Sequence, residues 1–158
     1  MDNPKKNFDD YFSVAFRIKG DDLDPSAITA SLGIEPDIMW KKGDFRTVTA
    51  KSGKIIYCAP HDFGYWCIES KLDKHCRIQE HIESILGRIA PKEDMFSKLQ
   101  TDGFRMDFFC GYFFSCINTP ILFINGDVLK RMGNLGIELR IDLYSVYSDR
   151  FLESEENP

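Results

Sequence analysis

The chain has 158 residues, of which 43% are hydrophobic and 28% charged, a composition typical of one globular domain with a single core. Its formal net charge of −5 and pI of about 5.2 argue against direct binding to nucleic acid, which selects a basic surface. No apolar run approaches the roughly 18 residues that cross a bilayer. The first residues are polar and do not resemble a secretory signal. We therefore expect a cytoplasmic protein that does not enter membranes.

The first predicted element is a strand over residues 11–19, where apolar and polar side chains alternate strictly. Asp24 followed by Pro25 predicts the start of a short helix, since aspartate caps helices and proline suits their first turn. Gly33 is placed to end this helix in a left-handed conformation. Pro36 then prevents the next extended segment from becoming a central strand.

The middle of the chain predicts a hairpin over residues 47–58 and a strand over 65–69. Two helices are expected next, over 70–90 and 91–103, and then a long aromatic strand over 105–116. Ser70, with Asp73 three residues later, is the expected cap of the first of these helices, and Leu72 is expected on its apolar side. The second helix should bury Phe96 and Leu99. Gly111 within the aromatic strand predicts a bulge or a close approach of backbone.

The tetrapeptide Leu-Gly-Ile-Glu occurs twice, at residues 32–35 and 135–138. The second copy follows a predicted strand at 121–124, a cap at Asn125 and a helix, and it leads into a clearly alternating strand that ends at residue 144. We interpret both copies as joints where a helix stops on glycine and passes into an extended segment. The side chains expected to be buried in these joints are Leu32, Ile34, Leu135 and Ile137.

These elements predict an α+β fold, a mainly antiparallel sheet with helices packed on it, built from two pseudo-repeated ferredoxin-like β-α-β halves. We assign residues 11–148 to this single domain. Residues 1–10 form a polar N-terminal arm, and residues 149–158 an acidic tail expected to be disordered.

The segment Leu-Gly-Ile-Glu-Pro-Asp with Trp-Lys-Lys-Gly-Asp at residues 32–44, and the strand LGIELRIDLYSV at 135–146, resemble a family of small bacterial proteins filed only as a domain of unknown function. The similarity extends over residues 11–147. It implies a single-domain, cytosolic bacterial protein. The family carries no assigned catalytic or binding residues, so the resemblance leaves the function open.

Five cysteines without a C-x-x-C pair predict free thiols in a reducing compartment. Cys58 and His61 are spaced like half of a zinc site, but Cys67 lies in a strand and Cys76 on the apolar side of a helix, so the second half is missing. We therefore expect no metal and no other cofactor. A cysteine–histidine nucleophile assembled by the fold stays open as an alternative, although no local motif supports one.

Charge is distributed in blocks, with five acids and no base over residues 21–37 and five bases against Asp44 over residues 41–54. Trp40 stands between these blocks at the start of the segment Trp-Lys-Lys-Gly-Asp. Two interpretations of this segment remain: a recognition loop with a tryptophan beside two cations, or a structural turn with glycine at positive φ.

A small acidic chain without catalytic motifs suits a non-enzymatic protein-binding module. We predict an immunity or antitoxin-like protein that binds and masks a cognate bacterial toxin. A basic nuclease is a candidate for that toxin. The predicted anchors are Trp40 and Tyr144. The predicted steering residues are Asp21, Asp22, Asp24, Glu35, Asp37, Glu138 and Asp142. A small-molecule-sensing domain and a Cys/His-dependent enzyme are the alternatives, and the sequence does not decide between a monomer and a homodimer.

Overall fold

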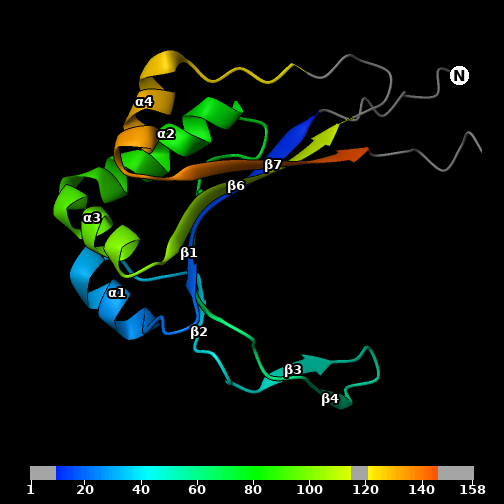
Figure 1. The fold of residues 1–158 in the computed structure, drawn as a ribbon. Helices are drawn as coiled ribbons and strands as arrows, with labels where there is room; N and C mark the ends of the chain where they lie inside the picture. The colour runs from blue at the N-terminus through cyan, green and yellow to red at the C-terminus, as the bar shows by residue number, and fades with distance from the viewer. Residues whose placement is uncertain (1–9, 115–120, 146–158) are drawn as a thin grey trace, which may run out of the picture.

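The computed structural model describes residues 10–114 and 121–145. Within them, a five-stranded sheet in the order β2-β5-β1-β6-β7 carries the helices along one face, and a separate hairpin, β3–β4, projects on the other side (Figure 1). The elements are β1 (Tyr11–Gly20), α1 (Pro25–Leu32), β2 (Ile38–Trp40), β3 (Arg46–Thr49), β4 (Ile55–Cys58), β5 (Gly64–Glu69), α2 (Ile78–Ile89), the 3-10 turn η1 (Ala90–Lys92), α3 (Glu93–Thr101), β6 (Arg105–Phe114), α4 (Gly126–Asn134) and β7 (Glu138–Ser145). The predictions for the N-terminal arm, the acidic tail and Cys116 fall outside the described residues, except for Asp10 at the start of the first range.

The topology is α+β, as the sequence predicts. The chain order β1-α1-β2-β5-α2-β6 gives four antiparallel strands in the order β2-β5-β1-β6, the split β-α-β arrangement of ferredoxin-like folds. The hairpin is inserted between β2 and β5. Helix α4 and strand β7 follow β6, and β7 pairs with β6 in parallel, so the sheet as described is mixed but mainly antiparallel.

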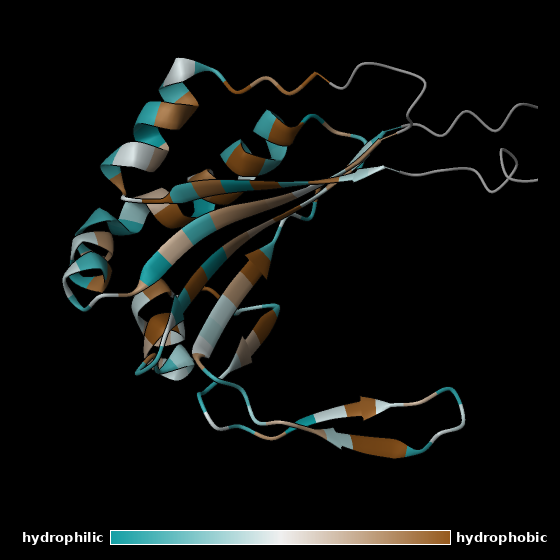
Figure 2. Cartoon of the chain, turned by 45° about the vertical axis from the view of Figure 1, so that its right-hand side comes forward, coloured by the Kyte–Doolittle hydropathy of each residue, from teal (hydrophilic) through white to brown (hydrophobic). Residues whose placement is uncertain are grey.

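The core lies between the sheet and the helices. Along β1 the residues that face the helices are Val14, Phe16 and Ile18, at most 3% exposed. The same alternation is visible as changing hydropathy along the strands in Figure 2. From β5 the fully buried Trp66 reaches α1, where its indole N–H donates a hydrogen bond to the hydroxyl of Thr29 at 3.0 Å. Burial of the aromatic ring therefore leaves no unpaired polar group.

Both Leu-Gly-Ile-Glu copies are helix-to-strand joints. Gly33 after α1 has φ +67° and Gly136 after α4 has φ +65°, the left-handed conformation that glycine adopts without strain. Of the expected core residues, Leu32, Leu135 and Ile137 are buried, and Ile34 is partly buried against the same core. The tetrapeptide is thus an architectural element in each place.

The strand predicted at residues 121–124 is not formed. Ile121 is 82% exposed and Phe123 69% exposed, and the segment pairs with no described strand. It runs beside α2 instead, where the backbone N–H of Asn125 donates to the side-chain carbonyl of Gln79 at 2.9 Å. An apolar run becomes a strand only where a neighbour completes its hydrogen bonds. The second predicted half therefore lacks its first strand, and α4 and β7 follow β6 instead.

The prediction that the helix over residues 70–90 is capped by Ser70 is wrong, because α2 begins at Ile78. At its start the Glu80 carboxylate accepts from the Arg77 backbone N–H at 2.7 Å, and the Glu80 backbone N–H donates to the Arg77 carbonyl at 3.0 Å. The Ser70 hydroxyl hydrogen-bonds instead to Nδ1 of His81 at 2.7 Å. Leu72, expected on the apolar side of this helix, precedes it and is 40% exposed.

The predicted hairpin is present as β3 and β4, joined by the turn that contains Gly53 at φ +80°. Its apolar side chains remain exposed: Phe45, Val48, Ile55, Ile56 and Tyr57. Among the described helices, none combines the length and apolar character that crossing a membrane requires.

Candidate functional site

The sheet has one face that no described helix or strand covers. Because side chains alternate along strands, those opposite the buried core positions point to this side. We call it the uncovered face. It comprises Ile38 and Trp40 of β2, Tyr65, Cys67 and Glu69 of β5, Tyr11, Ser13, Ala15, Arg17 and Lys19 of β1, Arg105, Asp107, Phe109, Gly111 and Phe113 of β6, and Glu138, Arg140, Asp142 and Tyr144 of β7.

An aromatic row crosses one end of the uncovered face. Tyr11, Phe113 and Tyr144 are register neighbours on β1, β6 and β7, and their rings stack with centroids 4.5 Å and 4.7 Å apart. The Lys74 ammonium lies 4.6 Å from the Tyr11 ring centroid. Gly111 forms no bulge, since pairing continues through it; a Cβ there would lie 3.4 Å from the Tyr144 ring. Glycine thus leaves room for the row.

A second stack occupies the opposite end and edge. The Trp40 ring lies between His61 and Tyr65, at centroid distances of 4.1 Å and 4.2 Å, and its indole N–H donates to the Phe63 carbonyl at 3.0 Å. The two predicted anchors, Trp40 and Tyr144, therefore lie on the same face but at its opposite edges, on β2 and β7. In both stacks the rings cover each other's faces.

A fixed set of ion pairs lies between the two stacks. Asp107 receives two hydrogen bonds from the Arg17 guanidinium, at 2.7 Å and 2.8 Å, and one from Lys19 at 3.0 Å. Burial opposes ionisation of Asp107, but these hydrogen bonds outweigh it and hold the pKa of the carboxyl below its usual value. The Arg17 guanidinium also lies 4.3 Å from the ring centroid of Phe109. Arg140 pairs in the same two-pronged way with Asp142.

The uncovered face offers no activated nucleophile among these side chains. Cys67 is 1% exposed, and burial raises the pKa of its thiol to about 11, so it is protonated near neutral pH. Burial likewise raises the pKa of the Tyr65 hydroxyl. The interactions that these side chains offer are ring stacking, cation–π contact and paired charges.

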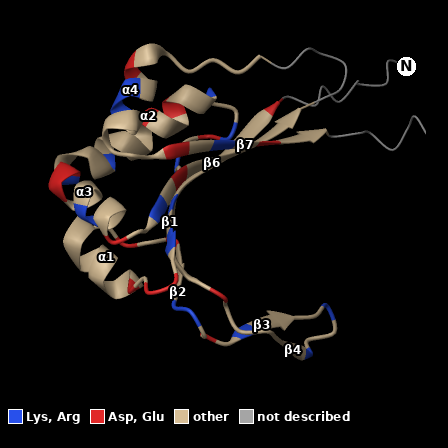
Figure 3. Ribbon diagram, in the orientation of Figure 1, with Lys and Arg blue, Asp and Glu red and all other residues tan. Residues whose placement is uncertain are grey.

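The acidic and basic blocks of the sequence meet at two ion pairs near β2, where Figure 3 shows adjacent red and blue segments. Lys41 lies 3.1 Å from the Asp24 carboxylate, and Lys42 lies 3.0 Å from that of Asp21. The Asp44 carboxylate accepts from the backbone N–H of Lys41 at 2.7 Å, which closes a turn with Gly43 at φ +86°. The geometry of this segment fits the structural turn.

Most of the predicted steering residues have a cationic neighbour. Asp37 pairs with Lys71, Asp142 with Arg140, and Glu138 lies 3.6 Å from Arg105. Within the described part of the chain, Asp22 and Glu35 form no ion pair. The free negative charge among the predicted residues is thus concentrated on Asp22 and Glu35.

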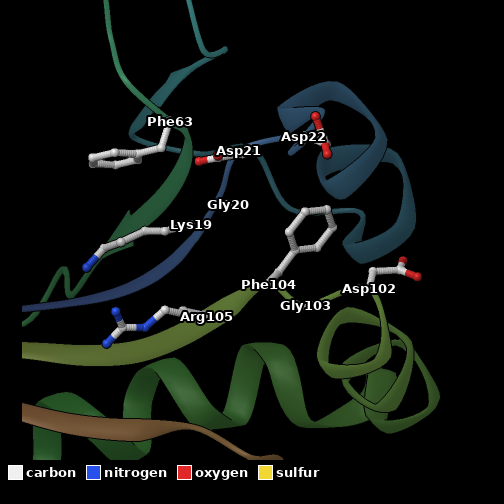
Figure 4. A pocket seen from close by; sticks show the side chains of 9 residues that line it. All are labelled: Lys19, Gly20, Asp21, Asp22, Phe63, Asp102, Gly103, Phe104 and Arg105. Atoms are coloured by element: carbon white, nitrogen blue, oxygen red, sulfur yellow. The ribbon is translucent and has the colours of Figure 1, made fainter.

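A cleft of about 750 Å³ opens where the turn after β1 meets the turn before β6 (Figure 4). It is lined by Lys19, Gly20, Asp21, Asp22, Phe63, Asp102, Gly103, Phe104 and Arg105. The Phe104 ring covers Gly20 so closely that a Cβ there would lie 2.3 Å from it. Sequence reasoning identified Asp21 and Asp22 but missed the aromatic walls, because they come from segments about 40 residues apart.

A second, smaller cavity of about 280 Å³ lies beside Ser70 and His81. His81 is 2% exposed, its Nδ1 bonds Ser70, and its Nε2 has no hydrogen-bond partner among the described residues. Burial lowers the pKa of His81, which favours the neutral ring. In a serine–histidine catalytic pair a third group orients the second ring nitrogen. Among the described residues no such group contacts Nε2, and no cluster of them could hold a metal ion.

No curated protein and no solved structure matches the chain. One family model matches residues 10–146, nearly the whole sequence and all of the described sheet and helices. The chain belongs to the family described as Domain of unknown function (DUF4279).

Proposed function

We propose that the protein is a non-enzymatic protein-binding module that acts as an immunity or antitoxin-like protein, neutralising a cognate bacterial toxin by binding and masking it in the cytoplasm. The observation that carries this proposal is the uncovered face. It presents aromatic rings and bidentate ion pairs that are already held in place by their neighbours. Preorganised aromatic and arginine side chains are the commonest anchors of protein interfaces.

A nucleic acid is a poorer occupant of this face. Bases bind single-strand platforms by stacking on free ring faces, whereas Phe113 is stacked on both sides and Trp40 likewise. Arg17, Lys19 and Arg140 are paired with carboxylates and would have to leave them to bind phosphates. The formal net charge of −5 opposes such binding further.

The charge also supports a basic partner. A net-acidic chain attracts a basic protein at long range, which speeds encounter without fixing the final contacts. Because Asp21 and Asp24 are paired with lysines, Asp22 and Glu35 become the principal steering residues in this proposal. Tyr144, 41% exposed at the end of the aromatic row, becomes the principal anchor.

The test uses the product of the neighbouring gene as the partner. Its expression alone should stop growth of a host strain, and co-expression of this chain should restore it. Surface plasmon resonance should then show a tight complex. Tyr144→Ala should weaken it by about 2 kcal/mol or more, mainly through faster dissociation, while Leu129→Ala on the helix side serves as the control. Absence of binding at micromolar concentrations contradicts the proposal.

A steering test uses the unpaired acids. Replacing Asp22 and Glu35 together with Asn and Gln should slow association and reduce its salt dependence, with little change in dissociation. The matched control is Asp21→Asn with Asp24→Asn, because these carboxylates are already paired with lysines. Equal effects of both pairs would show that only net charge matters.

A small-molecule-sensing domain is the second candidate, and the cleft of about 750 Å³ favours it. Its walls combine Phe63 and Phe104 with charged side chains of both signs, which suits a ligand with an apolar body and charged groups. Native mass spectrometry of the purified chain should then show a bound metabolite. Phe104→Ser should abolish that adduct under this alternative and leave partner binding untouched under the first proposal.

A further inference from the structure

The β3–β4 hairpin, taken here as residues 45–58, lies apart from the five-stranded sheet and the helices (Figures 1 and 2). Its strands pair only with each other among the described strands. A two-stranded hairpin alone is marginally stable in water and needs packing on at least one side. Since this chain provides no such packing in the described residues, another surface is needed to cover it.

Both sides of the hairpin carry exposed apolar side chains. The register places Val48 with Ile56 on one side, 46% and 47% exposed, and Ile55 with Tyr57 on the other, 56% and 77% exposed. Phe45 at the base is 84% exposed. Together these side chains offer on the order of 500 Å² of apolar surface, a large part of the roughly 800 Å² that each partner buries in a standard interface.

The hairpin is also the basic part of an acidic molecule. Residues 45–58 contain Arg46, Lys51 and Lys54 and no acid, a formal charge of +3. The whole chain carries −5, so the remainder carries −8. Figure 3 shows the same contrast, with blue and no red along the hairpin. The net-acidic remainder of a second copy therefore attracts the hairpin at long range, while the uncovered face itself carries four acids and four bases.

We propose that a second copy of this chain covers the hairpin. The hairpin projects on the side opposite the helices, the side of the uncovered face, and away from its own sheet (Figure 1). In a two-fold dimer with the uncovered faces opposed, each hairpin lies on the uncovered face of the other copy. Such a two-fold dimer leaves no free copy of either surface, and each contact between hairpin and face occurs twice. The apolar side chains of the hairpin then meet the apolar and aromatic side chains of the uncovered face, and the opposite net charges of the hairpin and of the rest of the chain favour the encounter.

This dimer goes beyond the proposed function and does not depend on it, since it concerns the chain alone. It would occupy the face proposed for the toxin, so the two occupants compete. Partner binding would then convert the dimer into a complex with one copy of this chain. Self-association is measured without any partner, so its failure leaves the proposed function standing.

The experiment is sedimentation velocity of the full chain across the micromolar range. We expect a concentration-dependent dimer that high salt weakens. Changing Ile55 and Tyr57 together to Ser should raise the dimer dissociation constant by about tenfold or more. Leu129→Ser on α4 is the matched control, because Leu129 is 47% exposed but lies on the helix side. All of these side chains are exposed, so thermal unfolding should confirm that each variant folds.

A mixing experiment tests which surface receives the hairpin. The hairpin variant keeps an intact uncovered face, and Tyr144→Ser keeps an intact hairpin. Each should self-associate weakly, whereas their mixture should form a heterodimer through one unaltered contact. A monomer at every concentration, a dimer indifferent to the hairpin variant, or a mixture no stronger than its components would overturn the proposal. Loss of toxin binding by the hairpin variant of a monomeric chain would assign the hairpin to the toxin instead.

Discussion

Truncation of Leu135 to alanine probes the second helix-to-strand joint. Leu135 is 4% exposed and belongs to the single core between the sheet and the helices. The substitution removes the three carbons beyond Cβ, and at about 0.8 kcal/mol per buried methylene-sized group this loses roughly 2 kcal/mol in all. The cavity left behind adds about 24 cal/mol per Å³ that the neighbours fail to fill, so we expect a total of about 2–5 kcal/mol.

The assay is equilibrium unfolding in urea, followed by tryptophan fluorescence. The free energy of unfolding should fall by the stated amount with an unchanged dependence on urea concentration. Leu129→Ala is the matched control in α4, since Leu129 is 47% exposed and alanine favours helix, so we expect a loss below about 1 kcal/mol. A loss below about 1 kcal/mol for Leu135→Ala would refute the placement of this joint in the core.

The pKa of Asp107 lies below its ordinary value of 3.8, so its ion pairs stabilise the fold above that pH. This stabilisation is lost as pH falls through the lower pKa of the folded state. In urea titrations at several pH values, Asp107→Asn should therefore reduce the loss of unfolding free energy at acid pH. Gly33→Ala and Gly136→Ala should each lower the melting temperature, and by similar amounts, because both positions need positive φ and the exposed Gln100 side chain beside residue 136 can move aside. In the native protein Cys67 should react with a thiol reagent far more slowly than the half-buried Cys58, as peptide mapping would show, and equal rates would contradict the burial of Cys67.

Local signals predicted most of the secondary structure. The strict alternation that begins at Tyr11 and the alternation after Gly136 correspond to β1 and β7, and Asp24 and Asn125 cap their helices as expected. These signals depend on neighbours within one turn or one pleat, which the sequence contains directly. The misses have non-local causes. Ser70 matched a capping pattern, but its hydroxyl is bonded to a histidine 11 residues away.

The site was predictable only in part for the same reason. Alternation placed Glu138, Asp142 and Tyr144 on one side of a strand, and the structure agrees. The aromatic row, however, depends on the register of β1, β6 and β7, whose residues lie up to about 130 positions apart. The pairing of Lys41 and Lys42 with the acidic block likewise requires the turn geometry. Single-sequence patterns carry no register between distant strands.

The most direct test of the central claim, that the uncovered face binds a protein partner, is hydroxyl-radical footprinting of the complex. The chain would be labelled with and without the neighbouring gene's product, at a concentration too low for self-association. We predict that partner binding protects Tyr11, Phe113 and Tyr144 and leaves Leu129 on the helix side unchanged. Protection of Leu129 with unchanged labelling of the three aromatic side chains would contradict the claim.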